Sequence, residues 1–152
     1  MKRIIATLST LILVSIAAEA LAGPVEEVAQ IAGPRLKAFQ EGDVDAYAAA
    51  LADNAVVNSS SSAFRIEGKE AIRAYFTELF QIYPRRRIFV RQSAMRAYND
   101  DLVISNSYLA LNVTDQQGKI TAFQLRSSVA WAKLGGRWQI VDQHTSRLPV
   151  AP

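Results

Sequence analysis

Cysteine is absent from the sequence, and histidine occurs once, as His144. Without cysteine there can be no disulfide, no thiol catalysis and no zinc site built from thiolates. A single histidine also excludes a metal site made of several imidazoles. Motifs that bind cofactors are missing as well. We therefore expect a protein that holds neither a metal ion nor a cofactor.

An excess of charge of one sign is missing too. The 152 residues include 17 Lys and Arg against 14 Asp and Glu, which gives a net charge of +3. This charge is too small and too scattered to indicate a nucleic-acid partner. Half of the residues are apolar and a fifth are charged, as in an ordinary globular protein. The length fits one domain.

Residues 1–22 have the pattern of a secretory signal peptide. Lys2-Arg3 is followed by an apolar run over 4–18, which is long enough for a signal peptide and short for a membrane span. Ala20-Leu21-Ala22 provides the small residues that signal peptidase requires. We expect cleavage after Ala22 and a periplasmic or secreted protein with no membrane attachment afterwards. An uncleaved membrane anchor is the alternative.

Helical patterns come first in the mature chain. Pro24 suits the first turn of a helix, and Gly33-Pro34 predicts a kink or a restart within it. Gly42 should end this helix. Asp43 is a good N-cap for a second helix from Val44 to about Ala52.

A third helix is expected between Gly68 and Pro84. Its apolar residues recur at helical spacing and make a broad stripe, which consists of Ile72, Tyr75, Phe76, Leu79, Phe80 and Tyr83. Before it, residues 55–57 and 64–66 read as short extended pieces around a polar loop. Arg85-Arg86-Arg87 follows it. A basic run can attract an anionic partner, but we interpret this one as the solvent-exposed start of a strand.

The period then changes from helical to alternating. Four long strands separated by short turns predict an antiparallel meander, over residues 86–98, 102–114, 120–134 and 137–146. Helices followed by strands indicate an α+β fold with the helices on one face of the sheet. The odd positions of 121–133 are the more apolar and should face the helices. The domain should cover 23–149, with an irregular tail at 150–152.

Three stretches resemble SnoaL-like proteins of the nuclear transport factor 2-like superfamily, namely EGDVDAY at 41–47, IEGKEAIR at 66–73 and GRWQIV at 136–141. The continuation DQHTSRLP at 142–149 is similar to the association (hub) domain of calcium/calmodulin-dependent protein kinase II and its bacterial relatives of the SgcJ/EcaC type. The resemblance spans roughly 25–149. It implies a cone, in which a curved antiparallel sheet wraps around about three N-terminal helices and the open mouth can hold a small molecule.

The resemblance also bears on ligand preference. The kinase hub lines its cone with arginines that bind carboxylates, and an ungapped alignment puts Leu109, Val129 and Thr145 at those positions. We therefore expect a small apolar or weakly polar ligand rather than a carboxylate. Tyr47, Phe76, Val129 and Trp131 are the candidate lining residues, although large aromatics on strands are more often core.

Asp142 and His144 are the candidate catalytic pair. They lie two apart on the last strand and so share a face, with His144 as the proton carrier and Asp142 as its orienter. Val141 and Thr145 alternate with them, and only one set can face inward unless a bulge intervenes. The alternative is that both residues lie on the outer face, in a subunit interface or in solvent.

Three functions remain open. The first is an oligomeric module that binds a small molecule, in the manner of a hub. The second is a cofactor-independent isomerase or cyclase that uses His144 and Asp142. The third is an accessory periplasmic interaction protein. A homo-oligomer, at least a dimer, is expected because Ile88, Val90, Leu102 and Ile104 should leave the outer face of the sheet apolar.

Overall fold

The structure is a computed structural model that describes residues 22–149. The expected signal peptide, up to residue 21, and the tail at 150–152 lie outside the described residues. Within 22–149 no helix combines the length and the apolar character needed to cross a membrane.

Within residues 22–149, three helices and six strands make one α+β unit. The helices are α1 (Pro24–Glu41), α2 (Val44–Ala48) and α3 (Lys69–Ile82). The strands are β1 (Leu51–Asn58), β2 (Ile66–Glu67), β3 (Arg85–Asn99), β4 (Leu102–Thr114), β5 (Ile120–Leu134) and β6 (Arg137–Arg147). They form a single sheet in the order β2-β1-β6-β5-β4-β3.

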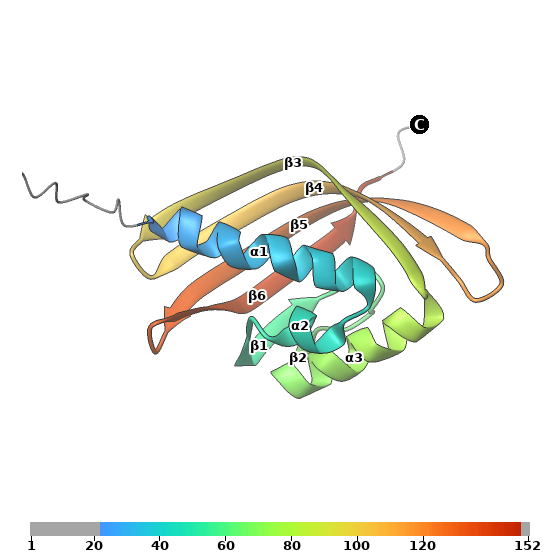
Figure 1. The fold of residues 1–152 in the computed structure, drawn as a ribbon, viewed down its shortest axis with the longest axis horizontal. Helices are drawn as coiled ribbons and strands as arrows, with labels where there is room; N and C mark the ends of the chain where they lie inside the picture. The colour runs from blue at the N-terminus through green and yellow to red at the C-terminus, as the bar shows by residue number, and fades with distance from the viewer. Residues whose placement is uncertain (1–21, 150–152) are drawn as a thin grey trace, which may run out of the picture.

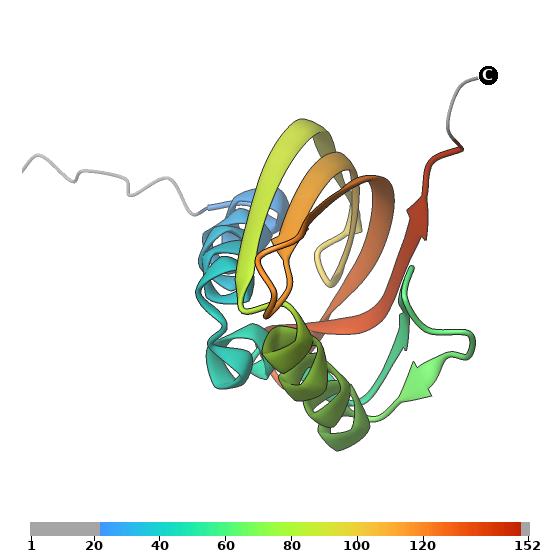
Figure 2. The ribbon, with the colours of Figure 1, turned by 90° about the vertical axis from the view of Figure 1, so that its right-hand side faces the viewer.

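The sheet is curved, and its concave side faces the helices (Figures 1 and 2). Helix α1 runs along this side, while α2 and α3 lie at one end of it. The long strands β3 to β6 form the antiparallel meander that the alternation predicted. Strand β1 adds to β6 in parallel, so the sheet as a whole is mixed rather than purely antiparallel.

One detail of the helix predictions was wrong. The second helix ends at Ala48 rather than near Ala52, because the backbone there joins the sheet: Leu51 pairs with Ile140, whose N–H donates to Ala50 O at 2.7 Å. This tertiary pairing outweighs the helical preference of the alanines. Of the kink or restart predicted at Gly33-Pro34, the restart does not occur: α1 is one helix that continues to Glu41 with Pro34 inside it.

Aromatic side chains from all three helices pack together. Phe39, Tyr47, Phe76 and Phe80 have neighbouring ring centroids between 4.5 and 6.4 Å apart, in tilted and edge-on arrangements. Such geometries are favourable beyond the apolar area they bury. The cluster consists of helix side chains only, so it packs the three helices against one another independently of the sheet.

Arg86 is buried where α1 and α3 end, with 5 % of its surface exposed. Its Nε donates to Phe39 O at 2.8 Å, and its two Nη atoms donate to Gln40 O, Phe80 O and Tyr83 O. Burial lowers the pKa of Arg86, but a guanidinium remains charged in proteins. Our interpretation of the basic run as solvent-exposed holds for its two neighbours and is wrong for Arg86.

Glu27 joins the first turn of α1 to the sheet. Its Oε2 accepts hydrogen bonds from Lys133 Nζ at 2.7 Å and Trp138 Nε1 at 2.6 Å. These two hydrogen bonds, Lys133 first, lower the pKa of Glu27 below its ordinary value of 4.5. Helix α1 is thus fastened to the sheet near its beginning by Glu27, and at its end by Arg86.

Replacing Arg86 should destabilise the fold. Arg86→Met leaves several helix-end carbonyls without a donor, so we expect a loss of about 3 kcal/mol or more in the free energy of unfolding. The stability of Arg86→Lys should lie between those of wild type and Arg86→Met, because an ammonium cannot reproduce the planar fork of hydrogen-bond donors. Arg85→Met, on an exposed neighbour, should change stability by less than about 0.5 kcal/mol. Urea denaturation measures all three, and equal effects at 85 and 86 would contradict the assigned role.

Glu27 should make stability depend on pH. Its pKa is lower in the folded protein, so its contribution is present above the ordinary value of 4.5 and is lost as the pH falls through the folded value. The destabilisation caused by Glu27→Gln should therefore be larger at about pH 7 than at about pH 3. Glu26→Gln, on the exposed neighbouring residue, is the control. Urea midpoints for Glu27→Gln that differ from wild type by the same amount at both pH values would refute this assignment.

Candidate functional site

A cavity of about 390 Å³ lies between α1, α3 and the concave face of the sheet. Tyr47, Phe76, Val129 and Trp131, the four candidate lining residues, all border it. Cavities that hold drug-sized ligands measure roughly 300–1,000 Å³. The space is therefore large enough for a small organic molecule.

One part of the lining is apolar. Side chains of the helices and of β3, β4 and β5 contribute to it, namely Leu36, Phe39, Phe76, Leu79, Ile88, Val90, Leu109, Leu111 and Leu125. Ile88 and Val90 were expected on the outer face of the sheet, and the structure places them on the cavity instead. Leu102 and Ile104 do not line it.

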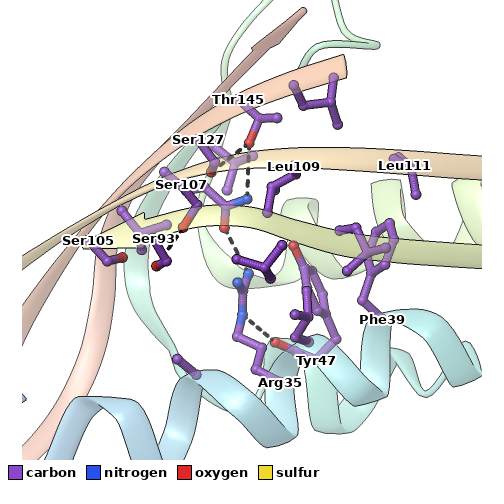
Figure 3. A pocket seen from close by; sticks show the side chains of 18 of the residues that line it. Arg35, Phe39, Tyr47, Ser93, Ser105, Ser107, Leu109, Leu111, Ser127 and Thr145 are labelled. Carbon is purple, nitrogen blue, oxygen red and sulfur yellow. Dashed lines mark hydrogen bonds between the residues drawn. The ribbon is translucent and has the colours of Figure 1, made fainter. Parts of the chain in front are cut away.

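A row of four hydroxyl groups crosses the sheet beside this apolar part. Ser93, Ser107, Ser127 and Thr145 are direct cross-strand neighbours on β3, β4, β5 and β6. Ser93 Oγ and Ser107 Oγ lie 3.0 Å apart, and Ser127 Oγ lies 3.1 Å from Thr145 Oγ1. Figure 3 shows the row on one side of the cavity, with Leu111 and Phe39 on the other.

Arg35 reaches into the cavity from α1. Its Nε donates to Tyr47 O at 3.1 Å, and its Nη2 donates to Gln143 Oε1 at 2.9 Å. The guanidinium carbon lies 3.9 Å from the centroid of the Tyr47 ring, a cation–π distance. Gln143 Nε2 continues the chain of contacts to Thr145 Oγ1 at 3.5 Å. The side chains of Arg35 and Tyr47 thus stand opposite the hydroxyl row (Figure 3).

Two β-bulges decide which side chains enter the cavity. In β6, Trp131 pairs with Ile140 but Ala130 pairs with Asp142, so Val141 is an extra residue. In β3, Arg91 is extra in the same way, between Val90 and Gln92. An extra residue switches the face of everything beyond it. These bulges bring Ser93 and Thr145 to the two ends of the hydroxyl row.

The bulge at Val141 also places the candidate catalytic pair. Asp142 and His144 are exposed on the outer face, whereas Gln143 is buried and lines the cavity with Thr145. His144 borders a second hollow of about 420 Å³, together with Arg65, Arg147 and the exposed Phe64. Proton transfer by this pair inside the cavity would need inward side chains, which the bulge prevents.

The hub-like positions Leu109, Val129 and Thr145 all line the cavity. Arg126 lies on the outer face, where its Nε donates to Ser146 Oγ at 3.0 Å. Arg35 is the one charged residue among the described residues of the lining, and our sequence reasoning missed it. The signal was present, because Arg35 falls at helical spacing within the apolar series Val28, Ile31, Ala32, Leu36 and Phe39.

The lining limits the chemistry that the cavity can support. Among the described residues that line it there is no Asp, Glu, His or Lys, the side chains that most often act as general acids or bases. Within residues 22–149, no group of three His, Asp or Glu side chains is placed to hold a metal ion. Binding through hydrogen bonds and apolar contact is what this arrangement offers directly.

Comparison with solved structures shows the same fold. A protein provisionally assigned as a calcium/calmodulin-dependent protein kinase II association domain from Xanthomonas campestris superposes with a TM-score of 0.74 at 23 % identity, covering 83 % of this chain and 89 % of that one. A provisionally assigned dehydratase of the nuclear transport factor 2-like family from Streptomyces avermitilis gives 0.74 at 10 % identity, with 84 % and 98 % covered.

A ketosteroid isomerase-like protein from Erwinia carotovora atroseptica SCRI1043 gives a TM-score of 0.72 at 18 % identity, with 83 % of this chain and 97 % of that chain covered. No curated protein matches this chain in sequence. The model of the calcium/calmodulin-dependent protein kinase II association domain matches residues 25–149. That match covers nearly all of the described residues, so the chain belongs to the calcium/calmodulin-dependent protein kinase II association domain family.

Proposed function

We propose that this protein is an exported, oligomeric module that binds a small organic molecule in the cavity between α1, α3 and the sheet. The observation that carries the proposal is the cavity itself, with its volume of about 390 Å³, its largely apolar wall and its single band of polar groups. Ligand sites in proteins commonly combine an apolar lining with a few convergent polar groups.

A binding role fits the lining better than a catalytic one. An isomerase or cyclase needs a group that removes a proton from the bound molecule. The polar side chains that line the cavity are the Tyr47 phenol, the Arg35 guanidinium and neutral hydroxyl and amide groups. None of these is a carboxylate or an imidazole that could readily accept a proton from the bound molecule. His144 and Asp142 are on the other face of β6, and no observation favours the enzymatic alternative.

Association between copies is supported by the family and by the outer face of the sheet. An association domain implies a protein that assembles, and several large apolar side chains are exposed, among them Phe89, Tyr98, Tyr108 and Leu134. Tyr98 is 64 % exposed and Phe89 is 52 % exposed. Large exposed apolar patches mark interfaces in many soluble proteins. A twofold dimer would bury the same patch from both copies.

Export and assembly are tested together by native mass spectrometry of the protein expressed with its full sequence in a bacterial host. We expect a subunit that lacks residues 1–22 and a complex of at least two such subunits. The expectation rests on the signal-peptide pattern of residues 1–22 and on the exposed apolar side chains of the sheet. A subunit that retains residues 1–22 would refute export, and a strict monomer at tens of micromolar would refute assembly.

Binding in the cavity is tested with N-phenylnaphthylamine, a neutral apolar fluorophore. Its fluorescence should rise on binding, and Leu109→Trp, whose larger side chain would occupy part of the cavity, should weaken the binding by about tenfold or more. His144→Ala changes a residue on the outer face and should leave the affinity within about twofold of wild type. Binding that survives Leu109→Trp and is lost with His144→Ala would place the ligand in the outer hollow and overturn the proposal.

A further inference from the structure

We propose that the molecule bound in this cavity is uncharged and carries a carbonyl oxygen, as a ketone, ester or lactone does, and that the Ser127 hydroxyl donates a hydrogen bond to this oxygen. The inference rests on the proposed function, because it names the chemical class of the ligand for the same cavity. It is carried by a hydrogen-bond relay whose direction follows from the chemistry of its members, which are Arg35, Gln143, Thr145 and Ser127 in that order.

Arg35 sets the direction at the start of the relay. A guanidinium donates hydrogen bonds and cannot accept them. Arg35 Nη2 lies 2.9 Å from Gln143 Oε1, so the oxygen of the Gln143 amide must face Arg35. The amide nitrogen Nε2 then faces Thr145 Oγ1, at 3.5 Å. Gln143 is only 8 % exposed, and Arg35 therefore decides which way round this buried amide lies.

The direction passes through Thr145 to Ser127. An amide nitrogen can only donate, so Thr145 Oγ1 accepts from Gln143. A hydroxyl group has one proton, and the proton of Thr145 is left for Ser127 Oγ, which lies 3.1 Å away. Ser127 therefore accepts from Thr145 and keeps its own proton. Because hydrogen bonds in series polarise one another, the charge of Arg35 makes the last hydroxyl of the relay a better donor.

The proton of Ser127 is available to a ligand. Within residues 22–149, Ser127 Oγ forms a hydrogen bond only with Thr145 Oγ1. Ser107 is its cross-strand neighbour on β4 but is hydrogen-bonded to Ser93 instead. Ser127 is half-buried and lines the cavity, in the row between Ser107 and Thr145 (Figure 3). A hydroxyl group in this position offers a hydrogen bond to an acceptor atom inside the cavity.

The surroundings of Ser127 favour a ligand that is apolar apart from this acceptor. Leu125 and Val129 flank Ser127 on the inner face of β5, and Leu109 lies opposite Leu125 on β4. An alkyl or aryl group placed against these side chains would bury apolar surface, which is favourable. A carbonyl oxygen accepts from Ser127 without bringing a proton that needs an acceptor of its own, as a ligand hydroxyl would.

The test uses three probes with one carbon skeleton: 4-phenyl-2-butanone, 4-phenyl-2-butanol and butylbenzene. Each displaces N-phenylnaphthylamine from the purified protein at neutral pH. Ser127→Ala removes the donor and should weaken binding of the ketone by about fivefold or more, the effect of one hydrogen bond. Butylbenzene should stay within about twofold of its wild-type affinity, which also reports that the cavity is intact. Ser128→Ala, on the exposed neighbouring residue, is the control and should change neither affinity.

Gln143→Glu tests the direction of the relay. A carboxylate accepts from both Arg35 and Thr145, so the Thr145 proton turns towards residue 143 and Ser127 donates to Thr145. The Ser127 proton is then used within the protein, although the serine itself is unchanged. The ketone should bind about fivefold or more weakly, while the alcohol, which can donate its own proton to Ser127 Oγ, should stay within about twofold. Gln124→Glu makes the same change on an exposed residue of β5 and should alter neither affinity.

The outcomes separate this inference from the proposed function. The inference is overturned if the ketone does not displace N-phenylnaphthylamine, if Ser127→Ala leaves the ketone affinity unchanged, or if it weakens ketone and butylbenzene equally. It is also overturned if a folded Gln143→Glu variant binds the ketone as wild type does. In each of these cases, binding of N-phenylnaphthylamine in the cavity still supports the proposed function. The comparison at Ser127 stands alone if Gln143→Glu folds poorly. If N-phenylnaphthylamine does not bind in the cavity, the proposed function fails and the inference fails with it.

Discussion

The fold depends on one buried charge, the guanidinium of Arg86. It donates to carbonyls at the ends of α1 and α3 and lies 4.2 Å from the centroid of the Phe80 ring. A cation at the negative end of two helix dipoles is favourable, and leaving those carbonyls unpaired would be costly. Gly42 makes this approach possible, because a Cβ there would lie 2.6 Å from Arg86 Nη2. The spacing between the helices and β3 is set at this point.

A cavity in a small domain needs contacts that hold the helix and the sheet apart, because side chains in protein interiors otherwise pack closely and leave little empty space. Helix α1 meets the sheet through Glu27 near its beginning and through the carbonyls bound by Arg86 at its end. Gln40 Oε1 also accepts a hydrogen bond from Ile88 N at 3.1 Å, which covers the edge strand β3. Between these two anchors α1 crosses the sheet, and some of its side chains face the cavity instead of packing against the strands. The open volume follows from polar contacts at the two ends.

The sequence predicted the four long strands and the α+β class well, because strict alternation and short turns are local signals. It also identified Tyr47 and Trp131 as residues that now line the cavity. What it could not predict depends on pairing between distant segments. The bulge at Val141 appears only when β6 is aligned with β5, and the burial of Arg86 requires helix ends that are far apart in the chain. Arg86 is therefore buried although its sequence neighbours Arg85 and Arg87 are exposed, and the sequence alone does not distinguish the three.

The bulge at Val141 also determines the charge of the cavity. Ile140 is buried, so regular alternation from it would turn Asp142 and His144 inward. A carboxylate at that level of β6 would lie where Gln143 now meets Arg35 and would neutralise the guanidinium. With the extra residue, the neutral Gln143 accepts the hydrogen bond from Arg35 Nη2 at 2.9 Å, and Asp142 is left in solvent. The extra residue in β6 therefore keeps Asp142 and His144 out of the cavity, and the positive charge of Arg35 has no carboxylate partner there.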